Sequence, residues 1–186
     1  MDLRIVKTKN QIKQAFLALR HKYTPEKIKV KDICELAMIN KTTFYKYYVD
    51  SLALANEVEE SCMEKLMNAF SEKKSLFESP KAYVQGLLSA TEKYAEELRT
   101  VYRDRKDAFV AKLEKRLMQA YDNGEDNGED NGEDNAERSM AATFMISGTA
   151  HVLGQWLLSE ESKRPDLSTI TAYIERLTRN LMPATN

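Results

Sequence analysis

The side chains best suited to binding chemistry cluster in one short segment of the N-terminal third. Lys41, Thr42, Tyr45 and Lys46 follow Asn40, a residue type that commonly caps the N-terminus of a helix. A helix that begins at Lys41 projects these four side chains outward near its N-terminus. Ammonium and hydroxyl groups donate hydrogen bonds to phosphates and base edges, and the free N–H groups of a helix N-terminus add to phosphate attraction. The segment therefore predicts a surface that binds a polyanion.

This helix also needs a face that fixes it to the rest of the protein. Phe44 and Tyr48 are four residues apart and form that face, which we expect to pack against the apolar residues of a preceding helix over residues 30–37. Only Met38 and Ile39 connect that helix to Asn40. Two short helices joined by a tight turn, with basic residues around the second, predict a helix-turn-helix motif over residues 30–48.

The rest of the chain shows helical periodicity, and no strand-like alternation has a useful length. Only 6 Gly and 4 Pro in 186 residues leave little material for the turns of an all-β protein. The predicted fold class is all-α, with an N-terminal helix-turn-helix domain over residues 1–50 and a larger helical domain over residues 51–186. About nine helices are expected, near residues 5–20, 30–37, 41–48, 51–74, 80–98, 99–104, 106–121, 136–160 and 167–182.

Charge is divided unevenly along the chain. Residues 1–50 carry eleven Lys and Arg against five Asp and Glu, whereas residues 51–186 carry seventeen against twenty-four. A basic N-terminal region beside a nearly neutral remainder is typical of a protein that binds a polyanion, although a solvated lysine-rich surface has the same composition. The charge supports the helix-turn-helix interpretation without deciding it.

Seven of the acids lie in the tract 122–135, which repeats Asp-Asn-Gly-Glu and contains no base. Glycine at every fourth residue and like charges at the same spacing oppose a helix, so the tract predicts a solvated loop. The carboxylates raise the alternative of a calcium site. An EF-hand loop needs ligands at alternate positions, however, and the four-residue period does not supply them.

No pattern typical of catalysis or of metal binding is present. His21 and His151 are the only histidines, and neither forms a paired-ligand motif with Cys34 or Cys62. The sequence contains no glycine-rich phosphate loop and no nucleophile elbow. We therefore expect no enzyme activity, no metal and no cofactor. Cys34 is expected to be a packed side chain, with redox sensing by either cysteine as the alternative.

The sequence also favours a cytoplasmic location. Two cysteines suit a reducing compartment, and the first residues lack the apolar core of a signal peptide. Residues 139–159 contain no charged side chain but include hydroxyl, imidazole and amide groups and two glycines. Such a segment fits a helix buried in protein better than a membrane span.

Residues 28–48 resemble the DNA-binding domain of the TetR/AcrR transcriptional regulators, and the run Thr43-Phe44-Tyr45-Lys46-Tyr47-Tyr48 is the most specific part. The likeness covers residues 5–58. Members of the family commonly carry glycine at the position of Met38, so this turn is either strained or built differently. The usual lysine at the start of the fourth helix, which contacts a phosphate, is replaced in the run Asp50-Ser51-Leu52.

The resemblance implies a role for each residue that matches the family's motif. Side chains near base edges would be those of Lys31, Lys41, Thr42, Tyr45 and Tyr47. Those near phosphates would be Lys29, Thr43 and Lys46, and Asn40 belongs to the same DNA-binding surface.

The resemblance further implies a homodimer that binds a double-stranded, pseudo-palindromic operator. The helices near 136–160 and 167–182 would pair with those of the second subunit in a four-helix bundle, which would set two recognition helices about 34–36 Å apart. Small residues in the first of these helices support close helix approach independently: Ala141, Ala142, Gly148, Ala150 and Gly154.

In such regulators a small molecule binds among the middle helices and changes the separation of the two DNA-reading domains. The candidate lining residues are Met67, Phe70, Tyr83, Leu87, Tyr94, Tyr102, Phe109, Phe144 and His151. For each of them, ordinary core packing is the alternative interpretation.

The function predicted from the sequence is therefore a dimeric, sequence-specific transcriptional regulator, a repressor released from its operator by a small molecule. A regulator of the same fold that activates transcription through a protein partner is the first alternative. The second is a helical protein-interaction module that has lost DNA binding.

Overall fold

The computed structural model describes residues 3–70, 76–77, 79–123 and 133–179. This part of the chain contains nine α-helices, two short 3-10 helices and no strand, which confirms the all-α prediction. The described helices fall into two compact units of unequal size. None of these helices is long and apolar enough to cross a membrane.

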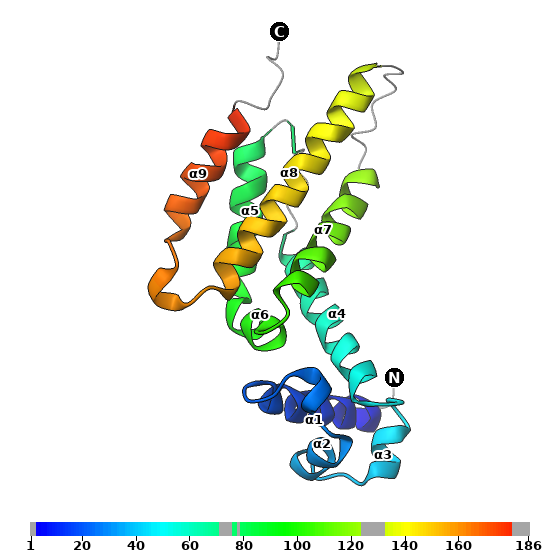
Figure 1. The fold of residues 1–186 in the computed structure, drawn as a ribbon. Coiled ribbons are helices and arrows are strands. Elements are labelled where there is room, and N and C mark those ends of the chain that lie inside the picture. The colour runs from blue at the N-terminus through cyan, green and yellow to red at the C-terminus, as the bar shows by residue number, and fades with distance from the viewer. Residues whose placement is uncertain (1–2, 71–75, 78, 124–132, 180–186) are drawn as a thin grey trace. The chain divides into compact units, whose positions relative to one another are not determined.

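Unit 1 consists of Met1–Glu64 together with Glu96–Asp104. Its helices are α1 (Leu3–Arg20), α2 (Val30–Leu36), α3 (Lys41–Tyr45), the first part of α4 (Ser51–Ala69) and nearly all of α6 (Ala95–Tyr102), as Figure 1 shows. Helix α2 packs against both α1 and α3. The core of the unit includes Ile12, Phe16, Ile33, Phe44, Leu54 and Leu98, all fully buried or nearly so.

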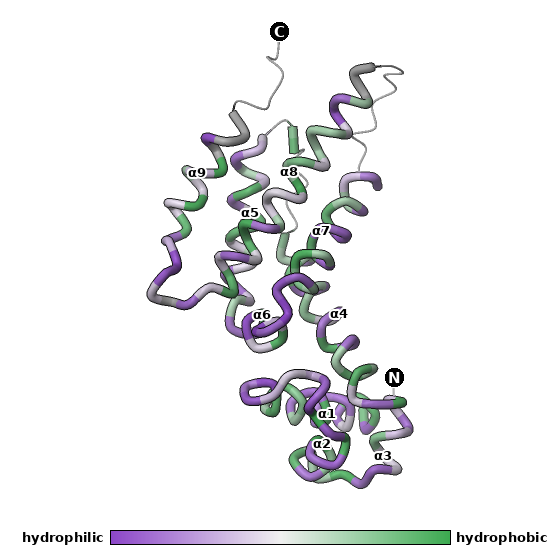
Figure 2. Tube along the Cα trace, in the orientation of Figure 1, coloured by the Kyte–Doolittle hydropathy of each residue, from purple (hydrophilic) through white to green (hydrophobic). Residues whose placement is uncertain are grey.

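Unit 2 consists of Lys65–Ala95 together with Arg105–Asn186. Its helices are α5 (Pro80–Lys93), α7 (Lys106–Asp122), α8 (Glu133–Leu158), α9 (Leu167–Arg179) and the end of α4. Helix α8 lies against α7 and α5, and α5 in turn contacts α9. Figure 2 shows hydrophobic and hydrophilic segments following one another along α5, α7 and α9, which gives each of these helices an apolar side to bury.

Two further helix starts, those of α4 and α9, are capped by aspartate side chains. Asp50 accepts a hydrogen bond from the Ala53 N–H at 2.7 Å, and Asp166 accepts one from the Thr169 N–H at 2.7 Å. Each carboxylate satisfies an N–H group that has no partner within its helix. Ser79 occupies the N-cap position of α5, but its side chain makes no capping hydrogen bond.

The prediction of one continuous helix over residues 80–98 is wrong. Helix α5 ends at Lys93, Tyr94 leaves helical geometry, and α6 begins at Ala95. The apolar side chains on either side of the break belong to different cores. Leu87 and Leu88 are buried in unit 2, whereas Leu98 is buried in unit 1. A single straight helix has one apolar stripe and does not serve both cores.

The remaining boundaries differ by smaller amounts or lie outside the described residues. Helix α3 ends at Tyr45 rather than at residue 48 and is followed by a turn. Unit 1 extends past the predicted domain limit at residue 50. The predicted ends of the fourth and last helices and most of the acidic tract 122–135 lie outside the described residues.

Candidate nucleic-acid interface

The turn between α2 and α3 is built around Met38. Its N–H donates to the Glu35 carbonyl, and the Ile39 N–H donates to the Cys34 carbonyl at 3.0 Å. This pair of hydrogen bonds closes a helix C-terminus when the first residue after the cap, here Met38, adopts the left-handed conformation. Met38 does so, with φ of 54°, although glycine is the residue that adopts this conformation without strain. Of the two alternatives left by the sequence, the strained turn is the one observed.

Asn40 starts α3 with its own side chain. Its Oδ1 accepts hydrogen bonds from the Thr43 N–H at 2.7 Å and from the Thr43 hydroxyl at 2.9 Å. These two bonds cap a helix of only five residues. The side-chain oxygen of Asn40 is thus occupied within the motif. The side-chain NH₂ group remains as the donor for an external acceptor.

Helix α3 presents two chemically different faces. Phe44 is fully buried and Tyr48, which follows the helix, is 4% exposed, with their ring centroids 5.6 Å apart. Lys41 and Lys46 are exposed, and Tyr45 is 54% exposed. The buried pair anchors the motif while the exposed side carries the hydrogen-bond donors, the arrangement expected of a recognition helix.

The other residues expected at DNA lie close to α3 in the sequence and are also accessible. Lys29, at the N-cap position of α2, and Lys31, in its first turn, are exposed, as is Thr42. Thr43 and Tyr47 are half-buried. The structure thus brings the nine residues into one helix-turn-helix, with Thr43 already hydrogen-bonded to Asn40.

Two lysines of α1 are used inside unit 1. Lys9 Nζ and Lys13 Nζ each lie 2.9 Å from Glu57 Oε1 on α4. Burial raises the pKa of the Glu57 carboxyl, but the hydrogen bonds and charges of the two lysines outweigh that effect and hold the pKa below its ordinary value. Lys9 also lies 5.3 Å from the centre of the Tyr48 ring. These contacts tie α1 and α4 to Tyr48, at the end of the helix-turn-helix.

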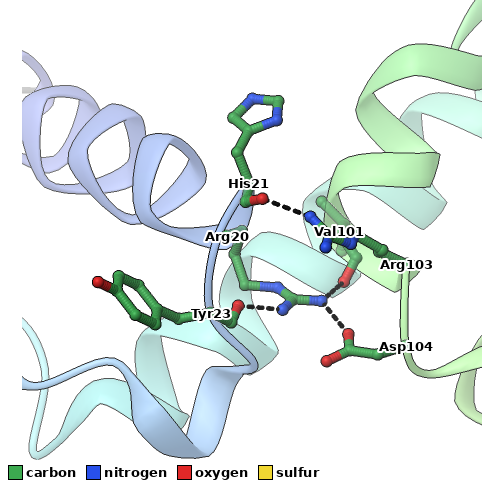
Figure 3. A network of polar contacts seen from close by, with 6 residues as sticks. All are labelled: Arg20, His21, Tyr23, Val101, Arg103 and Asp104. Carbon is green, nitrogen blue, oxygen red and sulfur yellow. Dashed lines mark hydrogen bonds and ion pairs between the residues drawn. The ribbon is translucent and has the colours of Figure 1, made fainter.

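Helix α6 is fastened to the end of α1 by a polar network that Figure 3 shows. The Arg20 side chain, 1% exposed, donates to the Tyr23 carbonyl at 2.6 Å and to the Val101 carbonyl at 2.8 Å. It also forms an ion pair with Asp104 at 2.6 Å, and Arg103 donates to the His21 carbonyl. The buried guanidinium of Arg20 is tolerated because its three acceptors, the Tyr23 and Val101 carbonyls and the Asp104 carboxylate, compensate for its lost hydration.

Sequence reasoning missed this network, although a signal was present. Ile12, Phe16 and Arg20 follow one another at four-residue spacing, so Arg20 lies on the apolar face of α1. A charged residue at such a position implies a buried partner. The Tyr23 carbonyl is close by, but Val101 and Asp104 lie more than eighty residues away in the sequence and are not identifiable from spacing.

The nine residues expected to line an effector pocket are distributed over different surroundings. Phe70 and Tyr83 contact each other edge to face in unit 2, with ring centroids 5.0 Å apart. Burial raises the pKa of the Tyr83 phenol. Leu87 and Phe109 are fully buried in unit 2, and Met67 and Tyr94 are half-buried there.

Three of the nine have other surroundings. Tyr102 is fully buried in unit 1, where its hydroxyl donates to the Glu59 carbonyl at 3.3 Å. Phe144, 64% exposed, and His151, exposed, lie on the outer side of α8. Tyr102 thus belongs to the core of unit 1, and Phe144 and His151 are not part of the buried core of unit 2.

The outer side of α8 forms an open groove of about 500 Å³. It is lined by Ser139, Met140, Thr143, Phe144, Ser147, Gly148 and His151. Met140 is 67% exposed, and a methyl group added at Gly148 would meet no atom within 4 Å. Gly154 differs, because a methyl group there would lie 2.5 Å from Val110 Cγ2. Of the two glycines in α8, only Gly148 faces open space.

Comparison with known proteins supports the fold. No family model matches the chain, and no curated protein matches it in sequence. A solved structure described as "Dihydroxyacetone kinase operon activator DhaS" has a TM-score of 0.56 and 17% sequence identity, with 94% of this chain and 96% of that chain covered. The two proteins share a fold. At this identity the likeness extends to the architecture of almost the whole chain and no further.

Proposed function

We propose that this protein is a sequence-specific DNA-binding transcriptional regulator of the TetR/AcrR type. The observation that carries the proposal is the two-sided α3, which buries Phe44 and exposes Lys41 and Tyr45, with the exposed Lys46 directly after it. Exposed donors on a short helix held by a capped turn suit the major groove, where base edges present acceptors. Lysine at the N-terminal end favours guanine, because the O6 and N7 atoms of that base accept hydrogen bonds.

The active form in this proposal is a homodimer that pairs α8 and α9 of two subunits. The apolar groove on α8, the open space at Gly148 and the 48% exposed Tyr173 on α9 support this choice. A two-fold dimer presents two α3 helices and therefore binds a pseudo-palindrome. The protein works in the cytoplasm, where Cys34 and Cys62 stay reduced.

Regulation in this proposal is repression relieved by a small apolar or aromatic molecule. The aromatic residues Phe70, Tyr83 and Phe109 of unit 2, of which Tyr83 and Phe109 are buried and Phe70 is half-buried, support an effector site there. The molecule must bind more tightly to the form that reads DNA poorly, because equal affinity for both forms shifts no population. Activation through a protein partner is the second candidate, favoured by the activator named for the solved structure.

The decisive experiment selects duplex DNA from a random or genomic pool with the purified protein at about 0.1–0.15 M salt, where phosphate-only binding is weakened. Enrichment of one pseudo-palindrome is the expected result. Lys41→Ala and Tyr45→Ala should each weaken binding to it by about 1–3 kcal/mol. Lys115→Ala, an exposed change on α7, is the control and should leave binding unchanged.

Two outcomes would redirect the proposal. Diffuse, salt-sensitive retention of DNA without an enriched sequence would favour a protein-interaction module that has lost DNA reading. If an operator is enriched, it is placed over or upstream of a reporter promoter. Higher expression from the upstream position, which only an activator produces, would favour activation over repression.

A further inference from the structure

The two ends of the Asn40 amide differ in what they can still bind. Oδ1 accepts hydrogen bonds from the Thr43 N–H at 2.7 Å and from the Thr43 hydroxyl at 2.9 Å. A backbone N–H only donates, so the amide atom that faces it is the oxygen, and this fixes the orientation of the amide. An amide oxygen has two lone pairs, and Thr43 occupies both. The acceptor of Asn40 is therefore fully used inside the helix-turn-helix.

The NH₂ group of the same side chain keeps two hydrogens to donate. Asn40 is exposed, and among the described residues its NH₂ group has no hydrogen-bond partner. The next residue, Lys41, is also exposed, and its ammonium group donates without accepting. Two consecutive side chains of the proposed DNA surface thus offer donors only.

The bases differ in how their major-groove edges meet a side chain that only donates. Guanine presents two acceptors, N7 and O6, whereas adenine presents the acceptor N7 beside the N6 amino donor, and cytosine presents its N4 amino donor. Asparagine commonly binds adenine with both ends of its amide, because its oxygen accepts from N6 while its NH₂ group donates to N7. The amide of Asn40 lacks a free acceptor for this pairing.

We propose that Asn40 is a specificity-determining residue that selects guanine and rejects adenine in the operator half-site. The inference rests on the proposed function, since it requires α3 to lie in the major groove. Guanine meets the NH₂ group with two acceptors, while adenine and cytosine place an amino group against it. The two hydrogen bonds from Thr43 thus turn an amide that suits adenine into a group that discriminates against it.

The central test repeats the selection of duplex DNA with Asn40→Asp. Aspartate has nearly the same shape and caps a helix about equally well, but an acceptor oxygen replaces the NH₂ group. A carboxylate accepts from cytosine N4, so one base of the half-site should change from guanine to cytosine. Affinity for the original operator should fall by about fivefold or more. Selection with Lys41→Ala identifies the base pair that the lysine contacts and keeps the two positions distinct.

Asn40→Ser controls for the negative charge of aspartate, which weakens binding to every duplex. Serine also caps a helix but has no NH₂ group. Its preference for guanine at the Asn40 position should fall without a gain for cytosine. Thermal unfolding of both variants should stay close to that of the unmodified protein, because each keeps a capping oxygen.

A modified base tests the same contact from the DNA side. In 7-deazaguanine a C–H group replaces the N7 acceptor of guanine. At the position assigned to Asn40 it should weaken binding of the unmodified protein by about threefold or more. The same substitution should leave binding of Asn40→Ser nearly unchanged, because that variant has no NH₂ group to lose its acceptor.

Thr43→Val tests why adenine is rejected. Valine keeps the shape of threonine and the capping N–H, but it removes the hydroxyl that occupies one lone pair of Asn40 Oδ1. The freed lone pair can accept from adenine N6, so discrimination between guanine and adenine should decrease. Unchanged discrimination would contradict the role given to the hydroxyl hydrogen bond.

The outcomes separate this inference from the proposed function. If Asn40→Asp and Asn40→Ser weaken binding to all duplexes equally and change no base preference, the NH₂ group contacts a phosphate and the inference is overturned. The proposed function survives that result, because an operator is still selected. If the unmodified protein selects no operator, the proposed function fails and the inference fails with it.

Discussion

Met38 introduces conformational strain into the helix-turn-helix. Met38 has φ of 54° and is 88% exposed, so its side chain gains little from packing. Replacing it by glycine relieves the left-handed strain, which costs a residue with a Cβ roughly 1–2 kcal/mol. Part of that gain is offset because glycine has more freedom in the unfolded chain. We expect Met38→Gly to raise the free energy of unfolding by up to about 1 kcal/mol, measured by urea denaturation.

Met38→Ala is the matched control, because alanine keeps the Cβ and therefore the strain while it removes the rest of the side chain. Its free energy of unfolding should stay close to that of the unmodified protein. A glycine variant that is less stable than the alanine variant would contradict the strain argument.

Residue by residue, the sequence predicted the local geometry of the helix-turn-helix better than it predicted the contacts that hold this motif. Asn40 as a cap and Phe44 as an anchor follow from spacing alone, and the structure confirms both. The pairing of Glu57 with Lys9 and Lys13 joins residues more than forty positions apart. Side-chain spacing carries no information on such partners, because they depend on how whole helices pack.

At the scale of helices, the start of α9 should depend on pH. Hydrogen bonds from the Ser168 hydroxyl and from the Thr169 N–H and hydroxyl lower the pKa of the Asp166 carboxyl from its ordinary value of 3.8. Because the pKa of Asp166 is lower in the folded state, the cap stabilises α9 fully at pH values above the ordinary pKa of the carboxyl. This stabilisation is lost as the pH falls through the lowered pKa of the folded state. Amide hydrogen exchange of Thr169 and Ile170 should therefore accelerate toward low pH.

Asp166→Asn tests the origin of that acceleration. Asparagine also caps helices but carries no titrating carboxyl group. After correction for intrinsic exchange rates, the variant should show no such pH dependence at these amides. If the dependence remained, another titrating group would be responsible.

The break between α5 and α6 shows where helix prediction from sequence fails. Apolar periodicity runs from Tyr83 through Leu98, and neither glycine nor proline lies next to Tyr94. Local residue types therefore give no reason for a helix to end there. The end is set by packing, since Leu88 and Leu98 belong to different units. Periodicity reports that a residue is buried but not in which core.

At the scale of the whole molecule, the two glycines of α8 predict opposite effects on folding. Gly154→Ala pushes a methyl group against Val110 and should destabilise the subunit by about 1–3 kcal/mol. Gly148→Ala adds a methyl group in open space and should stabilise the helix by roughly 0.8–1 kcal/mol. Thermal unfolding at low protein concentration measures both effects.

The same pair tests the proposed dimer. If α8 of a second subunit crosses closely at Gly148, the added methyl group should weaken dimerisation even though it stabilises the helix. Sedimentation equilibrium should then show a dimer dissociation constant raised by about tenfold or more, the equivalent of 1.4 kcal/mol. An unchanged constant would place the subunit contact away from Gly148.

The discontinuity of unit 1 also affects how the protein folds during synthesis. The unit includes Glu96–Asp104, so it is incomplete when the ribosome has released only the segment up to Glu64. The missing segment emerges forty residues later, which at about 5–20 residues per second takes roughly 2–8 seconds. During that interval Arg20 lacks its Val101 and Asp104 acceptors, and the core position of Leu98 is unfilled. Unit 1 is therefore complete only after α5 has been made.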